Sequence, residues 1–442
     1  MIEVAHKIEL TPNNKQKTYF RKAFGCARLA YNWGLAEWQE RYKKGEKADA
    51  YGLKKIFNSI KKEKYPFVLE VTKYATQQPF IQLGKAFSKF FSDLKKGTVS
   101  YPQFKKKSDS TGSFYIGGDQ VKLSDANLNS KKFRKMPHNE NQKHQYLKVP
   151  NLGWVRMTER LRFIGKINGV VISQHGSKFH ASFSVQVSDE EYHRTHPKVQ
   201  TLKPVGAVGI DLGIKESLTL SDGLFVENPK TLNTYQRKIT RISRQLSKRS
   251  HPKTKEERLK GVKKSANYMK LSLKLNKLHL KVADTRRNFI NKVTTILATT
   301  YGSIVMEDLN VRGMVKNHRL AKSVSDVSFS EIKRQIKYKA ECNGLELLFA
   351  DRFYPSSKTC SVCGTIKKDL KLSERVFRCP RCGAVMDRDY NASLNLLSLI
   401  PNKKVGTDYP EFTPVDLTAL QFRFLLNGIV TSKVETGKQH KL

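Results

Sequence analysis

Three acidic side chains stand where predicted strands end or a predicted helix begins. Asp211 follows the apolar run 205–210, Glu307 ends the run 303–307, and Asp389 lies in the segment DRDYNA at 387–392. Cutting a phosphodiester requires an activated water and neutralisation of the leaving oxygen. Two divalent ions about 3.5–4 Å apart, held by clustered carboxylates, provide both. Mg²⁺ prefers oxygen ligands, so the three acids are candidates for a two-magnesium site.

Each of these acids also has an ordinary structural explanation. An Asp at a strand end beside a Gly is often a turn residue, and an Asp in front of a helix is often an N-cap. The acids therefore indicate catalysis only as a set that meets at one edge of a sheet.

Four of the six cysteines form two close pairs near the C-terminus, Cys360-x2-Cys363 and Cys379-x2-Cys382. This spacing lets each pair hold one tetrahedral Zn²⁺ through two thiolates, and the Gly after each pair permits a tight turn. Two disulfides or a redox pair are the alternatives, but without a secretion signal the grouping favours a metal. Four thiolates leave no open coordination position, so this zinc is expected to be structural.

The acids require an α/β region to position them, and the second half of the chain has that pattern. An Asp-Gly at 222–223 between apolar runs is a hairpin signal, and two long basic helices with a break near 250–252 share an apolar seam. Strands that alternate with helices predict a mixed sheet. The predicted strands are 205–211, 216–220, 224–226, 303–307 and 345–350, and the last predicted helix before 345 is 330–343.

The first half of the chain divides into a helical and a β-rich part. Residues 2–10 alternate as a strand, and helical periodicity follows over 13–96. Short runs separated by Gly then predict a small barrel or curled sheet, which the first strand joins, and 188–204 is predicted as a linker. The predicted strands of this sheet are 146–149, 154–157, 169–173 and 179–187.

The charge of the chain indicates a polyanionic partner. There are 82 Lys and Arg against 39 Asp and Glu, a formal net charge of +43 spread along the sequence. Such a charge opposes compaction unless it is neutralised, as nucleic acid phosphates would do. Length and aromatic content argue against a packaging protein. No transmembrane run, amphipathic anchor or signal peptide is evident, so a cytosolic or nucleoid location without a membrane partner is expected.

These motifs together resemble the TnpB family, nucleases encoded by bacterial and archaeal insertion sequences and related to miniature type V CRISPR effectors. The resemblance covers nearly the whole chain and is most specific in the C-terminal third. It is carried by GIDLGIKESLTLSDG, IVMEDLNVRGM, YPSSKTCSVCG and FRCPRCGAVMDRDYNASLNLL, and by LTPNNKQKTYFRKAFGCARLAYNWGL and PQFKKK nearer the N-terminus.

The resemblance implies a multidomain α+β fold. Its parts are a helical recognition domain, a wedge-type β-barrel, and a RuvC-like, ribonuclease H-like α/β nuclease domain with an inserted zinc ribbon. The corresponding ranges are 1–12 for the first barrel strand, 13–110 for the helical domain, 111–200 for the barrel, 201–357 for the first part of the nuclease domain with its helical hairpin, 358–384 for the ribbon and 385–442 for the nuclease end and tail.

The resemblance also implies roles for individual residues. The family's catalytic acids, which hold two Mg²⁺, fall on Asp211, Glu307 and Asp389, in preference to the neighbouring Asp308 and Asp387. The four cysteines would hold one Zn²⁺. In relatives the helical domain and barrel read a short DNA motif, and the positions matching those contacts are Lys73, Gln77 and Gln78. Over 285–288 the chain reads TRRN where relatives often carry Asp or His, so details of the groove differ.

The implied activity is RNA-guided cleavage of double-stranded DNA, by a monomer bound to a transposon-derived guide RNA. Two other functions stay open: a guide-dependent DNA-binding repressor or targeting protein that does not cut, and a transposase that joins strands with a similar acid triad. All three acids are present, which argues against the repressor. The zinc module between the second and third acids argues against the transposase. A transposon-borne enzyme and a compact CRISPR effector are not separated by the sequence.

Overall fold

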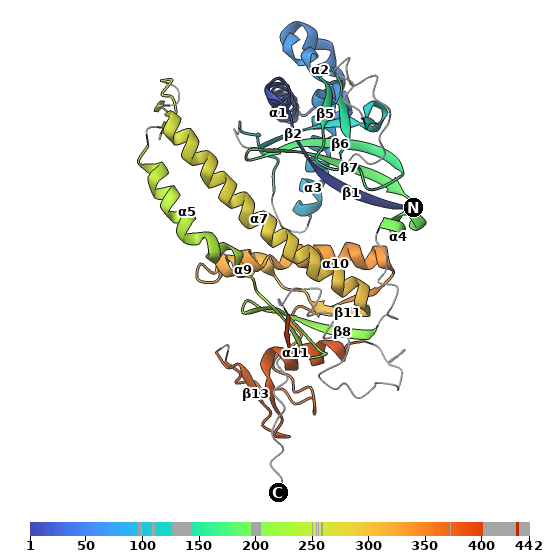
Figure 1. The fold of residues 1–442 in the computed structure, drawn as a ribbon, viewed down its shortest axis with the longest axis vertical. Helices are drawn as coiled ribbons and strands as arrows, with labels where there is room; N and C mark the ends of the chain where they lie inside the picture. Colours follow the sequence, from blue (N-terminus) through green and yellow to red (C-terminus); the bar gives the residue numbers. More distant parts are fainter. Residues whose placement is uncertain are drawn as a thin grey trace. The chain divides into compact units, whose positions relative to one another are not determined.

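The computed structural model forms two compact units, 1–197 and 198–442 (Figure 1). The structure describes residues 1–95, 97, 100–107, 111–125, 144–195, 205–249, 251–252, 254, 256–257, 260–371, 373–400 and 430–432. Among these residues, every helix is either too short or too polar to pass through a lipid bilayer.

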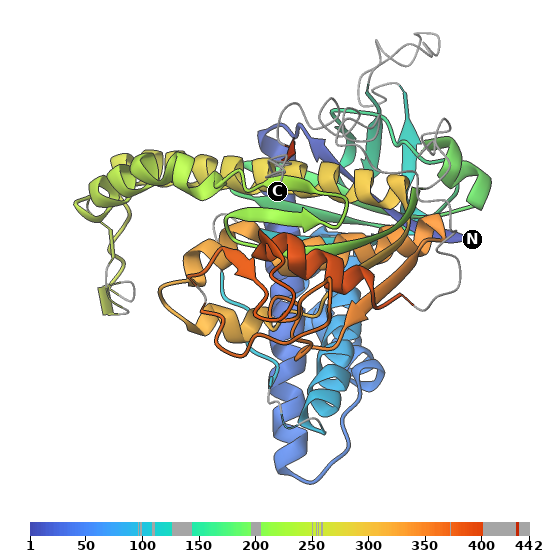
Figure 2. The ribbon, with the colours of Figure 1, turned by 90° about the horizontal axis from the view of Figure 1, so that it is seen from below.

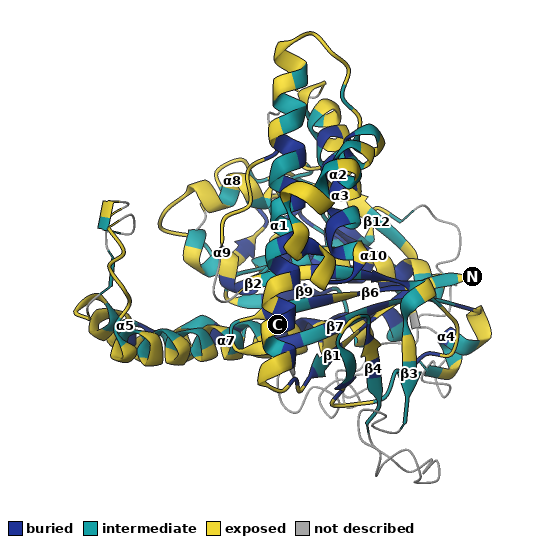
Figure 3. Ribbon diagram, turned by 90° about the horizontal axis from the view of Figure 1, so that it is seen from above, coloured by how far each residue is buried: buried dark blue, intermediate teal, exposed yellow. Residues whose placement is uncertain are grey.

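The first unit contains the three predicted helices, α1 (Asn14–Lys43), α2 (Ala50–Lys64) and α3 (Lys73–Leu94). Helix α1 begins at Asn13 because the Asn13 side chain and the Gln16 side chain cap each other's backbone N–H groups. The helices share a buried aromatic and aliphatic core that includes Leu35, Phe57 and Phe80. Dark blue marks such buried positions in Figure 3.

Two antiparallel sheets complete the first unit. The larger has the strand order β1-β7-β6-β2, and its register pairs Ile2 with Val187, so the first strand joins this sheet as predicted. The smaller has the order β3-β4-β5, and an isolated bridge between Leu10 and Met157 connects the two. The strands are β1 (Ile2–Leu10), β2 (Thr111–Gly117), β3 (Lys122–Ser124), β4 (Tyr146–Val149), β5 (Gly153–Arg156), β6 (Lys166–His175) and β7 (Lys178–Val187).

The predicted linker at 188–204 is wrong over its first part, because α4 (Asp189–Thr195) forms there. The Ser188 hydroxyl accepts from Glu191 N–H, and the acidic residues of the first turn suit the positive end of the helix dipole. Tyr192 is buried. Seven residues are too few for helical periodicity to stand out in the sequence. Residues 196–204 lie outside the described part.

The second unit contains the predicted mixed sheet, with strand order β12-β11-β8-β9-β10-β15. Strands β12, β11 and β8 run parallel, and β8, β9, β10 and β15 pair antiparallel. The Asp222-Gly223 hairpin is confirmed, and Gly223 has a φ of 85°. The strands are β8 (Val205–Leu212), β9 (Glu216–Leu220), β10 (Leu224–Glu227), β11 (Tyr301–Glu307), β12 (Glu346–Ala350) and β15 (Val430–Ser432).

Helices cover both faces of this sheet. On one face α7 (Ala266–Thr300) and α10 (Phe329–Asn343) pack over the core, while α11 (Arg388–Leu397) lies against the other face (Figures 1 and 2). The predicted pair of basic helices is α5 (Thr231–Ser247) and α7, which pack against each other. Two short helices, α8 (Val311–Lys316) and α9 (Ala321–Val327), follow β11.

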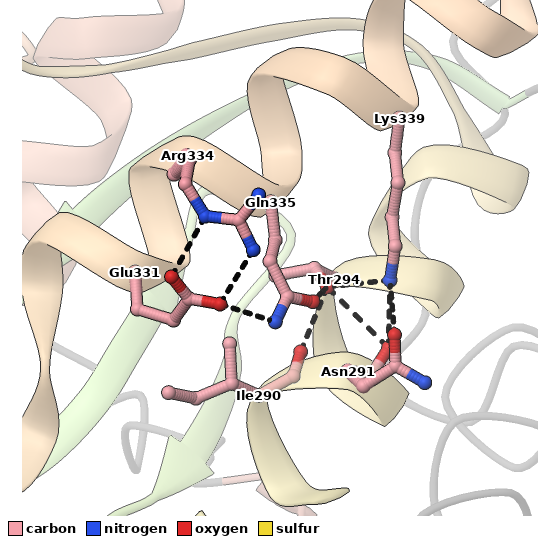
Figure 4. A network of polar contacts seen from close by, with 7 residues as sticks. All are labelled: Ile290, Asn291, Thr294, Glu331, Arg334, Gln335 and Lys339. Atoms are coloured by element: carbon pink, nitrogen blue, oxygen red, sulfur yellow. Dashed lines mark hydrogen bonds and ion pairs between the residues drawn. The ribbon is translucent and has the colours of Figure 1, made fainter. Parts of the chain in front are cut away.

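A buried polar network joins α10 to α7 (Figure 4). The Lys339 ammonium donates to oxygens of Asn291, Thr294 and Thr295 at 2.7–3.0 Å, and Thr294 donates to Gln335 at 3.0 Å. Lys339 is only 7% exposed, and burial lowers its pKa to about 7. None of its acceptors is acidic, so the network holds a cation by neutral oxygens.

Candidate active site

The alternation of side chains along β8 points Asp211 toward α11. Val208 and Ile210 are part of the core beneath α7 and α10. Gly209 instead meets α11, since a Cβ built on it would lie 2.0 Å from the Ser393 carbonyl oxygen. Successive side chains of a strand alternate between faces, so Asp211 shares the α11 face with Gly209.

Strand β11 places Glu307 on the same face by the same alternation. Ile304 and Met306 belong to the core under α7 and α10, whereas Val305 packs with Leu396 of α11. Glu307 is two residues beyond Val305, at the carboxyl end of the strand. Because β8 and β11 are parallel neighbours, their carboxyl ends bring Asp211 and Glu307 to one edge.

Asp389 reaches this edge from the first turn of α11. The carboxylate of Asp387 is the N-cap, because it accepts from the backbone N–H groups of Asp389 at 2.9 Å and Tyr390 at 3.0 Å. That leaves the Asp389 side chain available at the site. It forms ion pairs with Arg388 at 3.0 Å and Arg375 at 3.6 Å.

Asp308, the residue after Glu307, forms ion pairs outside the acid set. Asp308 forms ion pairs with Lys333 and, at 2.9 Å, with Arg352. Hydrogen bonds from these cations hold the pKa of Asp308 below its usual range. Its carboxylate is therefore engaged away from the acid set.

Electrostatics show that the three acids influence one another. Burial raises the pKa of Asp211 well above its usual range, and the charges of Glu307 and Asp389 raise it further. Burial also raises the pKa of Glu307, with a smaller contribution from Asp389, against the lowering effect of a hydrogen bond from Ser356. A group of buried carboxylates that repel each other is favourable for cation binding, since a cation relieves the repulsion.

The spacing of the acids limits how a metal would bind. Within the described part of the chain, the four cysteines are the sole group of three or more candidate ligands whose atoms all lie within 4.8 Å of one another. The three acids are spaced more widely, which excludes one ion bound by all of them in this arrangement. Two ions about 4 Å apart, each about 2.1 Å from its ligands, would span oxygens up to about 8 Å apart, so a pair of ions uses acids that are spaced more widely than a single ion allows.

The four cysteines converge as the sequence spacing predicts. Sγ of Cys360 lies 3.7 Å from Sγ of Cys382, and Sγ of Cys363 lies 3.5 Å from that of Cys379. A Zn–S distance of about 2.3 Å gives sulfur separations of about 3.8 Å in a tetrahedron, whereas a disulfide is about 2.05 Å long. The sulfurs are thus placed for one ion, and a buried Phe377 packs beside them.

The chain of contacts from this cysteine module to the acid site passes through two asparagines of α11. Asn391 accepts from Ser361 N–H at 3.0 Å and donates to the Thr359 carbonyl at 2.7 Å. Asn395 donates to the carbonyls of Thr359 and Ser356 at 2.6 and 2.7 Å. Ser356 in turn donates to Glu307 at 2.5 Å. The module, α11 and the second acid therefore form one bonded assembly.

Known families match three parts of the chain. Residues 1–47 match a model described as "Helix-turn-helix domain", 182–318 match "Probable transposase", and 329–396 match "Cas12f1-like, TNB domain". The chain is 28% identical over 409 residues to "Putative RNA-guided DNA endonuclease InsQ" of Escherichia coli K12, covering 89% of this chain and 91% of that protein.

The chain is similar to the TnpB family along most of its length. It is also 29% identical over 400 residues to a "Putative RNA-guided DNA endonuclease" of Streptomyces pristinaespiralis, with 90% of this chain and 89% of that protein covered. A "TnpB-like protein L79" of Acanthamoeba polyphaga mimivirus is 27% identical over 224 residues, which cover 47% of this chain and 39% of that protein.

Several residues around the acids were not singled out from the sequence. Ser356, Arg375 and Arg388 contact Glu307 or Asp389, and Asn391 holds the cysteine module. Asn391 and Arg388 lie inside the DRDYNA segment, so their position beside Asp389 was a usable signal. Ser356 lies in the segment YPSSKTCSVCG, which carries the family resemblance but does not connect it to Glu307. Arg375 has no such signal, because it reaches the site only through the fold.

The residues predicted to read DNA lie in the first unit, at the start of α3. Lys73 is exposed and pairs with Asp119 at 3.8 Å, with its ammonium 5.2 Å from the centre of the Tyr74 ring. Gln77 and Gln78 are half-buried on the next turn. Their role in motif reading stays a prediction.

Proposed function

We propose that this protein is an RNA-guided DNA endonuclease that hydrolyses target DNA at Asp211, Glu307 and Asp389. The observation that carries the proposal is the arrival of these three acids, from two parallel strands and a facing helix, at one edge of the sheet. The names of the relatives agree with it.

Two Mg²⁺ ions, when bound, would activate a water and neutralise the leaving oxygen. The chain's own contribution is to hold the ligands. Burial and mutual repulsion keep Asp211 and Glu307 ready to accept cations, and Ser356 fixes the orientation of Glu307. Arg388 and Arg375 form ion pairs with Asp389 and hold its carboxylate at the same edge, where it would serve as a metal ligand.

The outer face of α5 supports a nucleic acid partner. It borders an open hollow of about 550 Å³, and Figure 3 shows α5 as a largely exposed helix. Its cations recur every three or four residues on one face, and none pairs with an acid of the described residues. Such a row suits a phosphate backbone. The cations are Arg237, Arg241, Arg244 and Lys248.

By the same proposal, the guide RNA pairs with the target and the protein holds the heteroduplex in the prokaryotic cytosol or nucleoid. The second-unit sheet supports a RuvC-like, ribonuclease H-like nuclease domain. The cysteine module supports an inserted ribbon with one structural Zn²⁺, and the two sheets of the first unit support a wedge barrel. The domain ranges, the monomeric state and motif reading by Lys73, Gln77 and Gln78 belong to this proposal.

The test uses protein purified with its copurifying RNA, which is sequenced to design the target DNA. Wild-type protein should cut that DNA in Mg²⁺. Glu307→Gln should bind the DNA with little change and fail to cut it, because it removes a charge that holds metal. Glu341→Gln is the matched control, since Glu341 is exposed on α10.

Three outcomes would contradict the proposal. If Glu307→Gln cuts the DNA at the wild-type rate, Glu307 has no catalytic role. Tight target binding by the wild type without cleavage in Mg²⁺ or Mn²⁺ favours the repressor. A strand-transfer product favours the transposase, which the description of the 182–318 match names.

A further inference from the structure

Phe353 is exposed in a way that the fold does not require. Its side chain is 88% exposed, more than that of any other large apolar residue among those described. Exposing a Phe forgoes the favourable free energy that burial of its ring would provide. It lies in the short segment 351–356 that leads from the end of β12 toward the cysteine module.

The segment is held in place on the N-terminal side of Phe353. Arg352 pairs with Asp308, the residue that follows Glu307, at 2.9 Å. The side chain of Asp351 accepts from the Phe353 N–H at 2.8 Å, and its carbonyl accepts from the Tyr354 N–H at 3.0 Å. The backbone that carries Phe353 is therefore tied to the edge of the sheet.

The segment is also held in place on the C-terminal side of Phe353. Tyr354 packs onto the cluster between the sheet and α11, and its hydroxyl donates to the Asn395 carbonyl at 3.2 Å. Three residues after Phe353, Ser356 donates to Glu307. Both flanks thus bond to the elements that hold the acids, while the ring between them is left in solvent.

The segment that carries the ring is linked to basic and aromatic side chains, because Arg352 and Lys333 both pair with Asp308. Lys333 lies 4.3 Å from the centre of the Phe349 ring, which is itself 36% exposed, and Arg352 is half-exposed. Cations beside exposed aromatic rings bind single-stranded nucleic acid, because the cations attract phosphates and the rings stack on bases. A duplex hides the faces of its bases, so the strand that fits here is unpaired.

We propose that Phe353 stacks on a base of the single DNA strand that enters the acid site and so positions the scissile phosphate. This inference rests on the proposed function and names how the same site holds its substrate. The ring is a positioning residue, and the rigid segment sets its distance from Glu307 through Ser356. A ring held in place loses little freedom on stacking.

The experiment uses the protein with its copurifying RNA and a single-stranded DNA that is complementary to that RNA over one part and continues as an unpaired extension. Phe353→Ala should cut about tenfold more slowly. Phe353→Trp should keep the wild-type rate within about twofold, whereas Phe353→Leu should be as slow as Ala, since it is apolar but has no ring. Phe67→Ala, a half-exposed Phe of the first unit, is the matched control.

A second measurement reads stacking without hydrolysis. In an Asp211→Ala background, 2-aminopurine is placed at successive positions of the DNA strand. Its fluorescence at one position should be quenched when residue 353 is Phe and also in the Phe353→Trp variant. The fluorescence should recover with Phe353→Ala and with Phe353→Leu. If the wild type does not cut at all, the proposed function fails, and this fluorescence arm still decides the role of Phe353.

Two results overturn the inference. One is a Phe353→Ala variant that cuts at the wild-type rate, or a Phe353→Leu variant that restores the rate, which would indicate simple apolar packing. The other is fluorescence that shows no position-specific quenching dependent on the ring.

Discussion

Replacing Asn391 by Ala should separate zinc binding from DNA cleavage. Asn391 is fully buried and connects α11, which carries Asp389, to the backbone of the cysteine module at Thr359 and Ser361. The variant keeps all four thiols and all three acids, so any loss of cutting reports on this connection.

The size of the effect follows from the contacts that are lost. The Thr359 carbonyl still accepts from Asn395, whereas the Ser361 N–H loses its side-chain acceptor. An unsatisfied buried donor costs about 1–3 kcal/mol, and the small cavity adds to that, so the module should detach more easily by about 2–4 kcal/mol.

Zinc content and single-turnover cleavage should be measured on the same preparation. We expect one zinc per chain in the variant, as in the wild type, with cleavage reduced at least tenfold. Asn267→Ala is the control, because Asn267 is an exposed residue of α7. If Asn391→Ala cuts at the wild-type rate, the module does not position Asp389. If zinc is lost as well, Asn391 acts by stabilising the module itself.

Three further predictions follow from other parts of the second unit. Burial lowers the pKa of Lys339 from 10.5 to about 7, so the unfolded chain binds the extra proton between these values and stability rises with pH there. Between these pH values the free energy of unfolding of the wild type should rise by up to about 5 kcal/mol more than that of Lys339→Met, as measured by denaturant unfolding at each pH. An unchanged pH dependence in the variant would contradict this prediction. Cys382→Ser should lose zinc and cleavage together, by metal analysis and cutting assays, and full zinc content would exclude Cys382 as a ligand. Three cations of α5 should be replaced by Gln: Arg237, Arg241 and Arg244. The triple variant should bind the RNA more weakly, and the slope of its log binding constant against log salt concentration should fall by the equivalent of up to about three phosphate contacts. An unchanged slope would exclude this face as an RNA-binding surface.

Much of the second unit could be predicted because its signals are local. The Asp-Gly hairpin and the alternation around Asp211 depend on neighbours in the sequence, and the structure has both. The convergence of the cysteines follows from spacing alone. The hydrogen bond from Ser356 to Glu307 joins residues 49 positions apart and depends on how β12 and α11 pack. No local sequence pattern predicts it. Helix α4 was missed because its seven residues make fewer than two helical turns, too few for a periodic pattern to stand out.

Gly209 determines how closely β8, which carries Asp211, can approach α11, which carries Asp389. With no side chain there, β8 lies directly against the backbone of α11, at Ser393 and Leu397. A single added methyl group would act as a wedge beneath the helix and cost about 1–3 kcal/mol. The same wedge would move Asp389 away from Asp211, so the absence of a side chain at Gly209 sets the separation of these candidate carboxylates.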